Sequence, residues 1–279
     1  ALLKPIKSAD RTKISQDKDL MAKGRTYVGP KEYISLLAAV GMYTPKTNKD
    51  GSKQNMHMTG AEADVFIRDN MGAIPHLKPY LDAAVKAGRQ GEGFIATLGE
   101  SDWNLVYVEE FPSEPIGSDD EIYTNAFAST DNKDEPAILH SDRGTRSTAI
   151  HESMHRYASD AINTTWGFGF NEGVTEYFTR LLTDKNGEPA SKGGPSRNNY
   201  QSNFAFVSKM IKILGASTKS RETALAEMNF SGKIDILKTK FLAALKKAKI
   251  KGKAAEDSWN RFDAALRNGA WADALAELP

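Results

Sequence analysis

Two histidines four residues apart, with a glutamate directly after the first, are the residues of this chain best suited to chemistry. They are His151, Glu152 and His155 in the stretch HESMH. On an α-helix, residues four apart lie on the same face, so both imidazoles can reach one metal ion at about 2.0–2.1 Å. The glutamate can then act as general base on a metal-bound water. The spacing predicts a zinc-dependent hydrolytic centre.

The residues around this motif predict the helix that it needs. Ile150, Met154, Tyr157 and Ala161 recur at helical spacing and form an apolar stripe on a different face from the two histidines. The chain has only five histidines, which makes a chance match to this motif rare. The alternative interpretation is a surface helix with two solvated histidines.

Zinc needs a third protein ligand and one open position if it is to act in catalysis. Glu172 is the candidate, because it follows the glycine- and aromatic-rich turn 166–170, and Asn171 at the junction is a favoured helix cap. Glu176 lies one turn further on the same face and is the alternative ligand. A second carboxylate there also suits holding a histidine by its other ring nitrogen. In a third interpretation both glutamates lie on a solvated face.

Composition narrows the classes of protein to consider. The 279 residues suffice for one large or two modest domains, and the net charge of +1 gives no global attraction to nucleic acid or acidic membranes. With no cysteine, a zinc site must use His and Asp/Glu, which favours a catalytic over a structural site. No apolar run approaches the length of a membrane span. The first residues are not those of a signal peptide; the alternative is a leader that was removed before this numbering begins.

Periodicity predicts an α+β, predominantly α-helical chain with a small sheet directly before the motif helix. We expect a polar arm (1–30), a helical N-terminal region (31–95), a catalytic core (96–215) and a C-terminal helical region (216–279). The expected strands are 104–108, 121–128 and 137–140. The expected helices, besides one that begins at residue 31 and the motif helix, are 61–70, 76–87, 171–183, 198–214, 222–228, 232–248 and 255–277. His57 and His76 are interpreted as ordinary surface or core residues.

The motif, together with the Asn-Glu-Gly sequence at 171–173, resembles the gluzincin zinc metallopeptidases: the thermolysin-like enzymes, the related aminopeptidases and the minigluzincins. Their signature is HExxH followed by a glutamate on the next helix. The resemblance covers roughly residues 100–215. It implies a zincin-like fold, a Zn²⁺ cofactor held by His151, His155 and Glu172, and Glu152 as general base. It also implies a peptide or protein substrate.

The resemblance implies further roles and shows departures. Glu176 takes the place of an acidic residue that supports a zinc histidine. Tyr200 corresponds to a tyrosine that steadies the oxyanion, although Asn203 replaces a glycine of that pattern and Tyr200 equally fits a packing role. Only 16 residues, 156–171, separate His155 from Glu172, fewer than is usual in the clan, so the connection must be tight. The substrate strand of the aminopeptidases is not visible, which argues against their specificity.

The predicted strand at 137–140 occupies the place where clan members lay the peptide substrate against a sheet edge. His140 is therefore either a residue that lines the cleft or a polar strand end.

Other classes of function remain as alternatives. A zincin scaffold can bind a partner without cleaving it, and an exported toxin or effector domain can use the same site on one specific protein. The resemblance suggests a protein secreted or exported from a bacterium. The lysine-rich segment 233–253 is open to contact with nucleic acid or anionic lipid. The simpler interpretation is an amphipathic helix, with solvated lysines opposite a core stripe of Ile234, Leu237, Phe241, Leu242 and Leu245.

Overall fold

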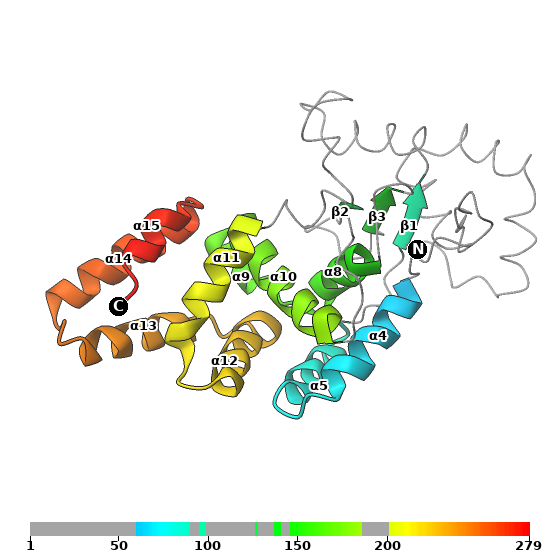
Figure 1. The fold of residues 1–279 in the computed structure, drawn as a ribbon, viewed down its shortest axis with the longest axis horizontal. Helices are drawn as coiled ribbons and strands as arrows, with labels where there is room; N and C mark the ends of the chain where they lie inside the picture. The colour runs from blue at the N-terminus through cyan, green and yellow to red at the C-terminus, as the bar shows by residue number, and fades with distance from the viewer. Residues whose placement is uncertain (1–59, 90–94, 99–125, 128–136, 141–145, 186–200) are drawn as a thin grey trace, which may run out of the picture. The chain divides into compact units, whose positions relative to one another are not determined.

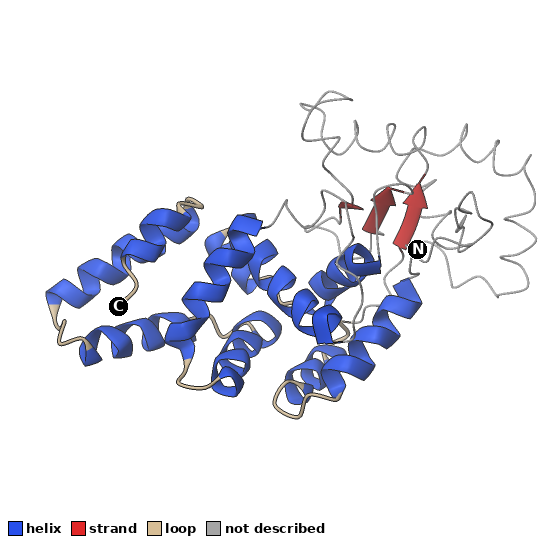
Figure 2. Cartoon of the chain, viewed as in Figure 1, coloured by secondary structure: helices blue, strands red, loops and turns tan. Residues whose placement is uncertain are grey.

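The computed structural model describes residues 60–89, 95–98, 126–127, 137–140, 146–185 and 201–279. Most of these residues are helical, which confirms the predicted helical character of the chain (Figure 2). The expected N-terminal arm, the helix expected from residue 31, the 104–108 strand, His57 and Tyr200 lie outside this part. None of the described helices is long and apolar enough to cross a membrane.

Helices and strands follow one another in the order in which Figure 1 labels them. The strands are β1 (Ile95–Leu98), β2 (Ala126–Phe127) and β3 (Ala137–His140). The helices are α4 (Gly60–Gly72), α5 (Lys78–Lys86), α8 (Arg146–Tyr157), α9 (Ala161–Trp166), α10 (Phe168–Lys185), α11 (Gln201–Met210), the 3-10 helix η2 (Ile211–Leu214), α12 (Thr218–Ser231), α13 (Asp235–Lys247), α14 (Lys253–Arg267) and α15 (Trp271–Ala276).

The chain divides into two compact units, of which one contains residues 1–65, 91–153 and 191–196 and the other 66–90, 154–190 and 197–279. The first unit holds the sheet, in the order β1–β3–β2, with β3 parallel to β1 and antiparallel to β2. Ala137, Ile138 and Leu139 are buried, and the predicted strand at 137–140 is confirmed.

The position of β3 in this sheet corrects one expectation. Ile138 pairs with Ala96 of β1 and with Phe127 of β2, so the β3 backbone is paired on both sides at this point. An added strand needs unpaired backbone N–H and C=O groups at a sheet edge. The expectation that this strand offers a free edge to a substrate is therefore wrong at Ile138, which is paired with both neighbouring strands.

The second unit is helical and packs around aromatic side chains. The six phenylalanines with the least exposure in this unit are Phe170, Phe178, Phe206, Phe230, Phe241 and Phe262. Ring centroids lie 5.0 Å apart for Phe178 and Phe230, which join α10 to α12, and 4.6 Å apart for Phe241 and Phe262, which join α13 to α14. Aromatic pairs at these distances add to the stabilisation that burial provides.

Several helix boundaries differ from those expected, because single residues begin or end helices within or outside the expected ranges. The single helix expected at 255–277 is two helices, since Gly269 adopts a left-handed conformation (φ 64°) between α14 and α15. Helix α12 begins earlier than expected, because Ser217 and Ser220 form a reciprocal capping box. Ala161, assigned to the stripe of the motif helix, belongs instead to α9.

The connection between α8 and α10 explains how a short segment reverses direction. After α8 ends at Tyr157, three residues lead into α9, and Gly167 alone separates α9 from α10. Gly167 has a φ of 82°, which favours glycine. Helix α10 begins at Phe168, so Asn171 lies within the helix, and its expected role as the cap is wrong.

The glycine of the Asn-Glu-Gly sequence is required by packing. A Cβ atom on Gly173 would lie 2.8 Å from the backbone oxygen of Asn203 and 2.9 Å from a methyl of Val207. Asn203 also donates a hydrogen bond from Nδ2 to the Gly169 carbonyl at 2.8 Å. Helix α11 therefore lies directly against the first turns of α10, and this contact holds the part of α10 that carries Glu172.

Candidate metal centre

Helix α8 carries the motif and buries most of it. Ile150, Met154 and Tyr157 are fully buried, as the apolar stripe predicted. His151 and Glu152 are only 4% and 6% exposed, although both are polar. The alternative of a surface helix with two solvated histidines is therefore wrong. Burial of ionisable groups is costly unless they are paired or bind a metal ion.

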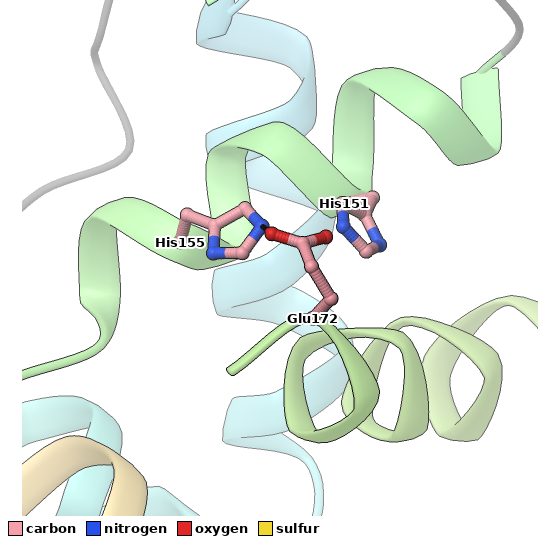
Figure 3. Close-up of side chains that lie close together, drawn as sticks. All are labelled: His151, His155 and Glu172. Carbon is pink, nitrogen blue, oxygen red and sulfur yellow. Dashed lines mark ion pairs between the residues drawn. The ribbon is translucent and has the colours of Figure 1, made fainter. Parts of the chain in front are cut away.

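Glu172 of α10 completes a cluster with the two histidines. Its buried carboxylate lies 3.1 Å, through Oε1, from Nε2 of His155. One potential ligand atom from each of His151, His155 and Glu172 lies within 4.8 Å of the others. Figure 3 shows the carboxylate between the two imidazole rings, with both rings coming from α8. The structure thus brings together the three predicted metal ligands.

The donor atoms of the cluster, and the one short spacing among them, are compatible with a bound metal ion. Two imidazole nitrogens and one carboxylate oxygen are a known donor set of catalytic zinc sites. Around a tetrahedral ion with ligands at about 2.0–2.1 Å, donor atoms lie about 3.4 Å apart. The 3.1 Å between His155 and Glu172 is close to that spacing. The group is therefore one that can hold a metal ion.

Two polar side chains of α10 face the other nitrogen of the His155 ring. Nδ2 of Asn171 and Oγ1 of Thr175 each lie 3.2 Å from His155 Nδ1. With Nε2 used for a metal, Nδ1 carries the proton, and the Thr175 hydroxyl can accept it in a hydrogen bond. The sequence interpretation missed both contacts. Their signal was the helical spacing, since Thr175 is three residues after Glu172 and shares its face.

Glu176 forms an ion pair within its own helix. Its Oε1 accepts a hydrogen bond from Arg180 Nε at 2.5 Å, and the Arg180 guanidinium lies 4.0 Å from the centre of the Phe204 ring. The guanidinium compensates the buried carboxylate. The metal group contains Glu172 rather than Glu176. The role of Glu176 in holding a zinc histidine stays a prediction.

His76 belongs to a separate cluster. Its Nε2 lies 2.7 Å from Oε2 of the buried Glu222 of α12, and Tyr177 of α10 neighbours the same carboxylate. Burial, together with the neighbouring carboxylate, raises the pKa of Tyr177 to about 12. This cluster ties the turn before α5 to α10 and α12, and His76 is not one of the metal group's residues. His140 ends β3.

The comparisons add no relative from which a role could be carried over. No protein-family model, no curated protein and no solved structure matches this chain.

The hydroxyl of Thr175 provides a test of how His155 is held. We expect Thr175→Val to weaken zinc binding by about 10–100-fold, because groups that orient a metal-binding histidine typically contribute that much. A titration against a competing zinc chelator measures the change. Thr179→Val is the matched control, since Thr179 is equally buried but its hydroxyl bonds to the Thr175 carbonyl at 2.9 Å. Equal affinities of the two variants would contradict a role for the Thr175 hydroxyl.

Proposed function

We propose that this chain is a zinc-dependent peptidase of the gluzincin type, with a zincin-like catalytic core. The observation that carries the proposal is the convergence of His151, His155 and Glu172 from two helices, with Glu152 beside the first histidine. Three protein ligands leave one position of a tetrahedral ion for water or substrate, as hydrolysis requires. The absence of cysteine fits the same conclusion, because structural zinc sites mostly use thiolates.

The residues of the site suit the cleavage of a peptide bond. His151, His155 and Glu172 would hold the zinc ion, which would make a bound water more acidic and polarise the substrate carbonyl. Glu152 accepts a proton from the attacking water as the new C–O bond forms, and delivers it to the leaving amine as the C–N bond breaks. Its near-complete burial favours this task, since a carboxylate shielded from bulk water exchanges its proton with the substrate rather than with solvent.

Two further residues have proposed roles that follow from the resemblance. Tyr200, outside the described residues, is proposed to donate a hydrogen bond to the oxyanion of the tetrahedral intermediate. Glu176 is proposed to help orient a zinc histidine in addition to its pairing with Arg180. The substrate is a peptide or protein.

Metal analysis combined with a peptide library tests the proposal. We expect about one zinc ion per chain and cleavage of library peptides that stops when a chelator removes the metal and resumes when zinc is returned. The cleaved bonds, identified by mass spectrometry, show the specificity. One bound zinc without cleavage of any peptide would contradict peptidase activity and favour a zincin scaffold that only binds its partner. A chain that takes up no zinc would contradict the whole assignment.

A further inference from the structure

The turn between α13 and α14 concentrates positive charge in a short stretch of sequence. Residues 246–253 read KKAKIKGK and contain no acidic residue. The five lysines are all exposed: Lys246, Lys247, Lys249, Lys251 and Lys253. Figure 1 shows this turn as the connection between the ends of the two helices.

Two other lysines of the same region form ion pairs. Lys233 pairs with Glu227 at 2.5 Å, and Lys238 pairs with Glu256 at 3.2 Å. Within the part of the chain that the structure describes, none of the five turn lysines forms an ion pair. The nearest acidic residues along the chain, Glu256 and Asp257, follow on α14, and Glu256 is already bonded to Lys238. The turn therefore presents five exposed lysines that form no ion pair within the described part of the chain.

An apolar side chain lies in the middle of this charge. Ile250, between Lys249 and Lys251, is 39% exposed and is one of three large hydrophobic residues that are exposed in the described part. Its backbone N–H donates to the Leu245 carbonyl at 2.9 Å, which fixes the turn. Lys249 has a φ of 68°, a left-handed conformation that glycine usually occupies at the end of a helix. A lysine thus occupies a backbone conformation that favours glycine.

We propose that this turn binds the surface of an anionic membrane, with the lysines on lipid phosphates and carboxylates and Ile250 inserted among the head groups. Lysine clusters are attracted to anionic leaflets, and an apolar side chain adds affinity by entering the acyl boundary. A surface of this kind is favoured over nucleic acid because the turn contains an exposed isoleucine but neither arginine nor an aromatic side chain for base contacts. The inference is independent of the metal site.

Sedimentation of the full chain with vesicles tests this proposal. We expect binding to vesicles that contain phosphatidylserine, no binding to phosphatidylcholine alone, and release at high salt. The double variant Lys249→Gly/Lys251→Gln should bind about 25-fold more weakly, since each lysine near an anionic surface contributes about fivefold. Glycine suits the left-handed backbone, so this variant keeps its fold. Lys219→Gln/Lys240→Gln, which removes the same charge from exposed positions outside the turn, should retain most of the binding.

Ile250→Ser distinguishes a membrane from other anionic partners. We expect it to weaken vesicle binding several-fold while thermal unfolding stays unchanged. Equal losses in the two double variants would overturn the proposal, because binding would then follow net charge alone. Unchanged vesicle binding by Ile250→Ser, together with equally tight binding of a DNA duplex, would also overturn it and indicate a general polyanion site.

Discussion

Replacement of Glu152 by glutamine is expected to abolish peptide cleavage while the protein keeps its zinc. The amide has the size of the carboxylate but cannot accept a proton, so the attacking water loses its base. General-base catalysis contributes about 10²–10⁴-fold, and we expect kcat/KM to fall by at least that factor. Zinc content should stay near one per chain, because Glu152 is not one of the three residues of the metal group.

The matched control for this experiment is Glu222→Gln. Glu222 is also a buried glutamate, 4% exposed, but it pairs with His76 rather than contributing to the metal group. We expect this variant to retain activity, although it loses stability at the α12 contact. Full activity in Glu152→Gln would exclude this residue as the base. Loss of zinc from the same variant would instead assign it to metal binding.

The sequence predicted those parts of the site that depend on spacing along one helix. His151 and His155 lie on one face of α8 because residues four apart are neighbours there, and the predicted apolar stripe of Ile150, Met154 and Tyr157 is fully buried on another face. Glu172 was predicted from the motif context, and its carboxylate does lie 3.1 Å from His155. The spacing of the two histidines is local to one helix. The position of Glu172 was predictable because the sequence around it resembles a known motif.

Features that depend on contacts between distant segments could not be predicted. The closeness of Gly173 to Asn203 depends on how α11 packs, and nothing in a single sequence measures that distance. The pairing of His76 with Glu222 joins residues 146 positions apart. The central place of β3 likewise follows from its pairing with two strands, whereas alternation of residue types predicts a strand without its neighbours. Sequence periodicity therefore identified the elements better than their partners.

Removal of the Glu172 carboxylate is expected to eliminate metal binding. In Glu172→Ala only two histidines remain as ligands. Loss of a residue that merely supports a metal ligand lowers affinity by about 10–100-fold, and we expect the loss of this ligand to lower zinc affinity by more than that. Activity should fall with it, and chelator treatment should no longer change stability. In the parent protein, zinc at 100 times its Kd adds about 2.7 kcal/mol to the free energy of unfolding. This stabilisation should be absent from the variant. Thermal unfolding of both proteins, with and without zinc, measures it directly.

Glu176→Ala is the control that decides between the two glutamates of α10. Both carboxylates are buried on the same helix, but Glu176 pairs with Arg180, whereas Glu172 faces His155. Loss of Glu176 leaves the Arg180 guanidinium without that partner, so we expect lower stability with or without metal, and zinc stoichiometry that stays near one. If Glu176→Ala lost zinc while Glu172→Ala kept it, the third ligand would be Glu176. Because the stabilisation by zinc is measured separately from the stability of the metal-free protein, a merely unstable variant cannot imitate the loss of a ligand.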